Sequence, residues 1–127
     1  MKPALFLDSV VAGFTSPASD FIEKKLDLNS FLIQNPEASF FVRVSGDSMK
    51  NAGIFSNDIL LVDKSLDPKN NDIIVAFLNG EFTVKRLSKK GTIISLVPEN
   101  SNYRTIRINS GDDFRVWGVV SSIIRKL

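Results

Sequence analysis

From residue 40 onward the sequence is a succession of short β-branched or aromatic runs separated by turn residues. Runs of this length, bounded by Gly, Pro, Asn, Asp and Ser, are typical of β-strands. The pattern predicts a mainly β fold, a compact antiparallel β domain of about seven strands. The seven runs are FFVRV, DILLV, DIIVAFL, EFTVKRL, TIISLV, YRTIRI and FRVWGVVSSIIRK.

One connection between these runs is specified closely. An Asn-Gly pair at positions 79–80 separates two strand-like runs, and this is the strongest short-range signal for a two-residue hairpin. The turn predicts a register in which Phe77 lies opposite Phe82. Continued along the strands, the same register places Ile74 opposite Lys85.

The N-terminal part has a different pattern. Residues 1–15 form an arm without helical periodicity. Ser16-Pro17 resembles an N-cap followed by proline at the first helical position, so we predict a short helix over Ala18–Leu26. A second helical turn is expected over Asn29–Gln34. At 127 residues with 43% hydrophobic residues, the chain has room for this arm and one domain, residues 16–127.

The amino-acid inventory excludes several kinds of chemistry. The chain contains no cysteine and no histidine. Disulfides, cysteine-based zinc sites, cysteine nucleophiles and every histidine-based catalytic triad are therefore excluded. If the chain is an enzyme, its base is a lysine, an aspartate or a glutamate, and we expect neither a metal nor a cofactor.

Charge and hydropathy set expectations for partners and location. Sixteen Lys and Arg against 14 Asp and Glu leave a net charge of +2, without a basic block, so specific DNA binding is not expected. No segment approaches the roughly 20 apolar residues of a membrane span. Asp8 and Ser9 interrupt the apolar start of the chain too early for a secretory signal. We expect a soluble, cytoplasmic protein.

The segment SGDSM, residues 45–49, follows directly after the run FFVRV. A serine at the end of a strand on a tight turn can expose its hydroxyl, and the turn can aim consecutive backbone N–H groups at one point. An oxyanion hole requires this geometry. The same residue types also make ordinary polar turns, so the segment alone leaves both interpretations open.

Lys85 lies within the run EFTVKRL, where strict alternation places it on the same face as Thr83 and Leu87. One interpretation is an edge lysine whose stem covers apolar surface while its ammonium reaches water. The other is a desolvated lysine with a lowered pKa, which is neutral and can take the proton of a serine hydroxyl. The strand pattern does not decide between them.

Taken together, these segments resemble the LexA-type self-cleaving serine-lysine proteases, and most closely the UmuD branch of DNA-damage-response accessory proteins. The combination of SGDSM with the lysine of FTVK is the most specific part of the resemblance. It extends over nearly the whole chain, and it implies a LexA/signal-peptidase-like β fold. The matching segments are VAGF, SPA, LDLN, LIQ, SGDSM, GEFTVK and WGVV.

The resemblance also implies roles for individual residues. Ser48 is the implied nucleophile and Lys85 the implied general base. The backbone N–H groups of Asp47 and Ser48 would hold the oxyanion, and the bond between Ala12 and Gly13 would be cut. Small side chains at the cut allow an extended arm to approach a serine closely, and the tether makes the attack intramolecular.

The resemblance also implies a function in the SOS response. A RecA filament on single-stranded DNA would trigger self-cleavage, and the product beginning at Gly13 would be the accessory subunit of an error-prone, UmuC-type Y-family DNA polymerase of the polymerase V kind. The family also implies a homodimer. Twelve residues before the cut leave no room for a helix-turn-helix domain, which favours an accessory subunit over a repressor.

Two alternatives stay open from the sequence. The chain could be a non-enzymatic binding subunit that docks on a polymerase and carries a vestigial dyad, which a complete lack of cleavage at alkaline pH would favour. It could also be a processing peptidase of the signal-peptidase kind, which cleavage of an added leader peptide in trans would favour.

Overall fold

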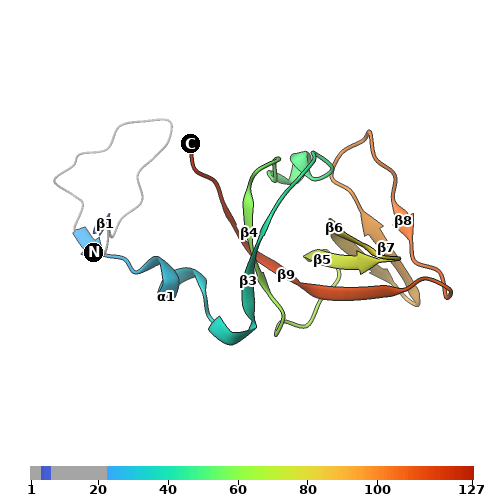
Figure 1. The fold of residues 1–127 in the computed structure, drawn as a ribbon, viewed down its shortest axis with the longest axis horizontal. Helices are drawn as coiled ribbons and strands as arrows, with labels where there is room; N and C mark the ends of the chain where they lie inside the picture. Colours follow the sequence, from blue (N-terminus) through green and yellow to red (C-terminus); the bar gives the residue numbers. More distant parts are fainter. Residues whose placement is uncertain (1–3, 7–22) are drawn as a thin grey trace. The chain divides into compact units, whose positions relative to one another are not determined.

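A computed structural model describes residues 4–6 and 23–127 of the chain (Figure 1). The chain divides into two compact units, Met1–Gln34 and Asn35–Leu127. The second unit contains the predicted strands and both predicted catalytic side chains, Ser48 and Lys85.

In the first unit, strand β1 (Ala4–Phe6) pairs antiparallel with β2 (Glu23–Lys25). The helix predicted over Ala18–Leu26 is therefore wrong at β2, and residues 18–22 lie outside the described part of the chain. A helix of nine residues has marginal stability because its first turn is costly to form. Here the backbone of β2 forms hydrogen bonds with the neighbouring strand β1 instead. The second predicted helical turn is present as α1 (Leu28–Leu32).

The second unit is built on one seven-stranded antiparallel sheet with the order β3-β4-β9-β5-β6-β7-β8. This confirms the predicted mainly β fold. Two short 3₁₀ helices, Pro36–Ala38 and Lys50–Ala52, lie on either side of β3 in the sequence. The strands are β3 (Ser39–Arg43), β4 (Ile59–Asp63), β5 (Ile73–Leu78), β6 (Glu81–Lys90), β7 (Ile93–Val97), β8 (Ile106–Arg107) and β9 (Phe114–Ile124).

Strand β9 joins the two halves of this sheet (Figure 1). Its C-terminal half pairs with β4 and its N-terminal half with β5, and each pairing contains a register shift. Bulges of this kind bend a strand and increase its twist. A glycine is needed here: a Cβ on Gly118 would lie 2.6 Å from Cγ1 of Val62.

The predicted hairpin between β5 and β6 is confirmed. Phe77 is opposite Phe82, and Ile74 is opposite Lys85. Asn79 and Gly80 both have positive φ, 48° and 92°, as a two-residue turn with Asn-Gly requires. The turn therefore fixes the position of Lys85 along β6.

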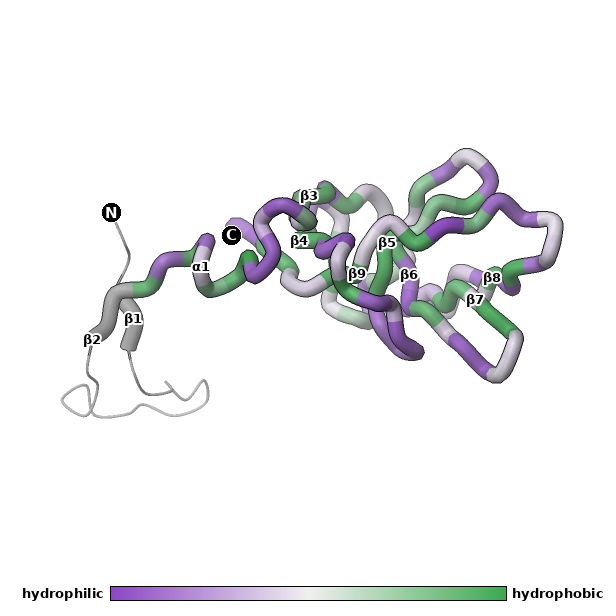
Figure 2. The backbone as a smooth tube through the Cα atoms, turned by 90° about the horizontal axis from the view of Figure 1, so that it is seen from below, coloured by the Kyte–Doolittle hydropathy of each residue, from purple (hydrophilic) through white to green (hydrophobic). Residues whose placement is uncertain are grey.

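The hydrophobic core consists of two clusters on opposite faces of the sheet. Alternation along β5 sends Val75 into one cluster and Ile74 and Ala76 into the other. Figure 2 shows the hydrophobic colour of β5. The buried residues of the first cluster are Val44, Met49, Ile54, Leu60, Val62 and Val75, and those of the second are Ile74, Ala76, Leu87, Leu96 and Val119.

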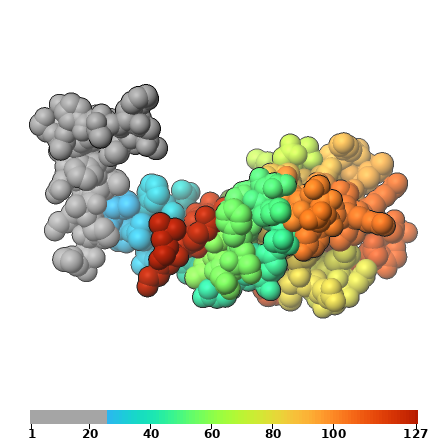
Figure 3. All heavy atoms as spheres, turned by 90° about the horizontal axis from the view of Figure 1, so that it is seen from above, coloured from blue at the N-terminus to red at the C-terminus, as the bar shows by residue number. Residues whose placement is uncertain are grey.

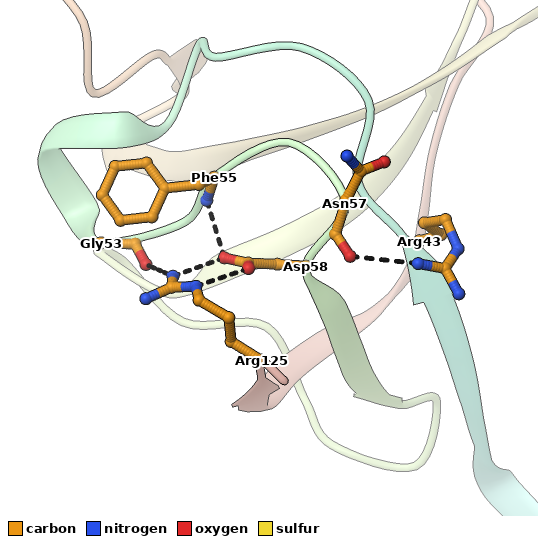
Figure 4. A network of polar contacts seen from close by, with 6 residues as sticks. All are labelled: Arg43, Gly53, Phe55, Asn57, Asp58 and Arg125. Carbon is orange, nitrogen blue, oxygen red and sulfur yellow. Dashed lines mark hydrogen bonds and ion pairs between the residues drawn. The ribbon is translucent and has the colours of Figure 1, made fainter. Parts of the chain in front are cut away.

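An ion pair between a buried aspartate and a partly exposed arginine joins the end of β9 to the loop before β4 (Figure 4). Asp58 is only 2% exposed. Arg125 donates to both of its carboxylate oxygens, at 2.7 and 2.6 Å, and the backbone N–H of Phe55 donates at 2.7 Å. Arg125 also donates to the carbonyl of Gly53 at 2.8 Å. The hydrogen bond from Arg125 is the main reason that the pKa of Asp58 is lowered.

We expect Asp58→Asn to lower the free energy of unfolding by about 1–3 kcal/mol at pH 7, because it breaks charge-assisted hydrogen bonds to a buried carboxylate. Since the folded-state pKa of Asp58 is lowered, its contribution is present above the ordinary pKa of about 3.9 and is lost as pH falls through the folded-state value. Urea titrations at pH 7 and pH 3 should therefore show a smaller difference between variant and parent at pH 3. Asp67→Asn, at an exposed position, is the control. An equal effect at both pH values would contradict this account.

Candidate active site

The two predicted catalytic side chains lie in contact, although they come from different elements. Ser48 is in the turn between β3 and the 3₁₀ helix Lys50–Ala52, and Lys85 is in the middle of β6. Lys85 Nζ lies 3.0 Å from Ser48 Oγ. The sheet order separates β3 from β6 by three strands, so this contact requires the sheet to curl.

The surroundings of Lys85 favour its neutral form. The residue is 8% exposed, and burial lowers the pKa of its amine. Nζ also donates to Thr83 Oγ1 at 2.7 Å and to the Val84 carbonyl at 3.1 Å, which uses the two N–H groups of a neutral amine and leaves its lone pair for the Ser48 hydroxyl. Among the described residues no carboxylate lies within ion-pair distance of it. In this part of the chain no negative charge therefore compensates an ammonium, while uncharged oxygens orient the amine.

Thr83 is a site residue that the sequence reasoning did not assign. Alternation along the strand placed it on the same face as Lys85, but no role followed from that position alone. In the structure its hydroxyl accepts the shortest hydrogen bond that Lys85 makes. Thr83 therefore helps to direct the amine toward Ser48.

The contact between Ser48 and Lys85 lies in a pocket of about 240 Å³ whose wall is both polar and apolar. The pocket lies between β3 and the first half of β6. Within the described residues, β3 pairs only with β4, and residues 81–85 of β6 pair only with β5. Each strand therefore has a free edge here. The lining residues are Val42, Arg43, Val44, Ser45, Gly46, Ser48, Met49, Val75, Phe82, Thr83, Val84 and Lys85.

The turn that carries Ser48 is packed against a distant segment, residues 99–103. The N–H of Glu99 donates to the Ser48 carbonyl at 2.8 Å, and the N–H of Asn51 donates to the Glu99 carbonyl at 2.9 Å. Figure 3 shows the orange segment around residue 100 next to the green segment around residue 50. Sequence reasoning assigned no role to residues 99–103, because no local pattern links them to the serine.

The backbone N–H groups of Asp47 and Ser48 are the predicted oxyanion donors. Neither donates a hydrogen bond to any residue in the described part of the chain. The preceding residue, Gly46, has a φ of 92°, a left-handed conformation that suits glycine. Within the described residues both N–H groups are therefore unbonded, as an oxyanion donor requires. The predicted cleavage site, Ala12-Gly13, lies outside the described residues.

Over residues 4–6 and 23–127, no group of three or more acidic, histidine or cysteine side chains could hold a metal ion. No helix in this part of the chain is long and apolar enough to cross a membrane.

The sheet and the pocket define a class of protein: an antiparallel β domain in which a serine hydroxyl meets a buried lysine amine. A comparison with family models agrees, because the model described as Peptidase S24-like matches residues 4–121. The chain therefore belongs to the Peptidase S24-like family, which is of the serine-peptidase kind.

Several curated proteins are similar over nearly the whole chain. Protein SamA of Salmonella typhimurium is 46% identical over 122 residues, which are 96% of this chain and 84% of the relative. Protein ImpA of Escherichia coli is 42% identical over 96% of this chain and 83% of its own length. Protein MucA of Escherichia coli is 37% identical over 91% and 80%. The predicted resemblance to the LexA/UmuD family is confirmed.

Proposed function

We propose that this protein is a serine-lysine autoprotease that cuts its own chain between Ala12 and Gly13. Ser48 is the nucleophile and Lys85 is the general base. The observation that carries the proposal is the 3.0 Å contact between Lys85 Nζ and Ser48 Oγ, made by an amine whose burial lowers its pKa. A lysine can act as base only in its neutral form, and these surroundings favour that form.

The proposed reaction has two halves. Neutral Lys85 takes the hydroxyl proton of Ser48 while Oγ attacks the carbonyl carbon of Ala12, and the N–H groups of Asp47 and Ser48 hold the oxyanion. The bond to the nitrogen of Gly13 then breaks, and the lysine gives its proton to this leaving amine. A water molecule, deprotonated by the same lysine, then attacks the ester carbonyl. The bond to Ser48 Oγ breaks, the lysine returns the proton to Oγ, and the carboxylate of Ala12 is freed.

The pocket supports an extended substrate. The free edges of β3 and β6 can each offer backbone hydrogen bonds to a strand-like segment placed between them. We propose that residues 1–15 form the cleavable arm that supplies this segment, and that residues 16–127 form the protease domain. Tethering the arm to the domain gives a high effective concentration at the serine.

We further propose that the shortened product, beginning at Gly13, is an accessory subunit in SOS mutagenesis. The support is the family and the similarity to the UmuD-like proteins SamA, ImpA and MucA. In this proposal a RecA filament on single-stranded DNA stimulates the cut, and the product binds a UmuC-type Y-family polymerase. A trigger of this kind would act by raising the population of an otherwise rare docked arm.

Intact-mass spectrometry of the purified protein, incubated at alkaline pH or with RecA, single-stranded DNA and a nucleotide, tests the proposal. Loss of residues 1–12 is the expected result. The alternative of a binding subunit with a vestigial dyad expects no cleavage under either condition.

Self-association is also proposed, through an aromatic face that we define as Phe40, Phe77, Phe82 and Trp117. The rings of Phe82 and Trp117 pack edge to face with their centroids 4.7 Å apart, yet the two residues are 55% and 41% exposed. The ring centroid of Phe40 lies 5.4 Å from that of Trp117, and the ring centroid of Phe77 lies 5.3 Å from that of Phe82. Covering such a face adds buried apolar area to a small domain.

Light scattering at micromolar concentration should give about twice the 14.1 kDa mass of one chain. Trp117→Ala should shift the protein toward monomer, because large aromatic side chains at the centre of an interface carry much of its binding energy. Phe41→Ala, at an exposed phenylalanine outside the aromatic face, should leave the dimer intact. A parent protein that stays monomeric at high concentration would contradict the proposed dimer.

A further inference from the structure

We propose that Asn100 is a positioning residue for the oxyanion hole: it fixes the orientation of the peptide group between Asp47 and Ser48. The inference rests on the proposed function. It adds a role for a side chain that touches neither the serine hydroxyl nor the lysine amine.

Both ends of the Asn100 side-chain amide are used, and the residue is only 4% exposed. Its Nδ2 donates to the Asp47 carbonyl at 2.9 Å. Its Oδ1 accepts the backbone N–H of Asn102 at 3.0 Å. Because Oδ1 is already bound by its own loop, the amide can turn only its N–H groups toward Asp47. A buried polar side chain held in this way is a fixed donor.

Planarity of the peptide bond connects this contact with the active site. In a trans peptide the C=O of one residue and the N–H of the next point in opposite directions. The Asp47 carbonyl points to Asn100, so the Ser48 N–H points away from the segment 99–103. Ser48 lines the active-site pocket, whereas Asp47 and Asn100 do not. The Asn100 contact therefore turns the Ser48 N–H away from the loop and leaves it available to the pocket.

Neighbouring contacts hold the same turn from the same side. Glu99 N–H donates to the Ser48 carbonyl at 2.8 Å, and the Tyr103 hydroxyl donates to Asp47 Oδ1 at 2.7 Å. Lys50 N–H also reaches the Asp47 carbonyl, at 3.2 Å. These bonds keep the turn folded when Asn100 is replaced. The loss of Asn100 should therefore loosen one peptide group rather than unfold the site.

The first test is the rate of self-cleavage of Asn100→Ala measured across a range of pH. Loss of one oxyanion donor typically costs about 100- to 1000-fold in rate, and a donor that is present but loosely held should cost about 10- to 100-fold. The pH at half-maximal rate should stay that of the parent, because Lys85 is untouched. Asn102→Ala, in the same loop, is the matched control and should cleave at the parent rate. A variant rate within about twofold of the parent, or a shifted pH profile, would overturn the inference.

The second test does not depend on cleavage. The ¹⁵N shift of an amide reports on the hydrogen bond accepted by the preceding carbonyl, so the Ser48 amide signal should move in Asn100→Ala and stay in Asn102→Ala. Asn100→Asp keeps an acceptor for the Asn102 N–H but lacks the donor to Asp47, so it should move the same signal. This variant replaces the alanine variant in the test if Asn100→Ala does not fold. An unmoved Ser48 signal in a folded variant would overturn the inference. A parent that never cleaves, with a Ser48 signal that moves, would refute the proposed function and leave the positioning role standing.

Discussion

Ser48→Ala is expected to abolish self-cleavage, with a loss of about 10⁴-fold or more in rate. The nucleophile of the proposed mechanism is then absent. The Thr83 hydroxyl also contacts the Lys85 amine, at 2.7 Å, but the proposed mechanism gives it no role as a nucleophile. Mass spectrometry after prolonged alkaline incubation should show only the full-length chain. The variant should remain folded, since Ser48 contributes a carbonyl rather than its hydroxyl to the contact with Glu99.

Ser45→Ala is the matched control for this substitution. Ser45 lies in the same turn and lines the same pocket, but no hydrogen bond joins its side chain to Lys85 in the described part of the chain. The Ser45→Ala variant should cleave itself at close to the parent rate. Cleavage that persists in Ser48→Ala, or stops equally in Ser45→Ala, would rule out Ser48 as the nucleophile.

Lys85→Met is expected to have an effect of similar size, because the chain has no histidine to replace the base. The parent rate should rise with pH, since only the neutral amine accepts the serine proton. Burial lowers the pKa of Lys85, so the rise should be centred below the ordinary lysine value of about 10.4. Initial rates measured from pH 7 to 10.5 would define this midpoint.

Two further substitutions make the test of the base specific. Lys85→Arg keeps the positive charge but cannot lose its proton in this pH range, so it should be inactive as well. Lys90→Met removes an exposed lysine from the same strand and should leave the rate and its pH dependence unchanged. An active Lys85→Arg variant would show that the residue contributes charge or packing rather than base catalysis.

The strands and the hairpin could be predicted from the sequence because they follow from local chemistry. Period-2 alternation and turn residues identify each strand, and the Asn-Gly turn alone sets the register that places Lys85 opposite Ile74. The partnership of Ser48 with Lys85 is different. It depends on the curl of the sheet between β3 and β6, and only the family resemblance indicated it.

Other features could not be predicted, because they depend on contacts between distant segments. The residues of β2 have no strong strand propensity, and pairing with β1 decides their conformation. Asn100 is unremarkable in sequence, and it acquires its role from the Asp47 carbonyl, which the fold brings near. Thr83 lies only two residues from Lys85, and its role depends on Ser48, which comes from a distant segment. The ion pair between Asp58 and Arg125 likewise joins residues far apart in the chain.

The most direct test of the central claim is the intact mass of the parent protein followed over time at pH 7 and pH 10. The account predicts conversion to a single product that begins at Gly13, faster at pH 10, together with a released fragment of residues 1–12. No cleavage under either condition or with RecA filaments, or a cut well away from Ala12-Gly13, would contradict the account.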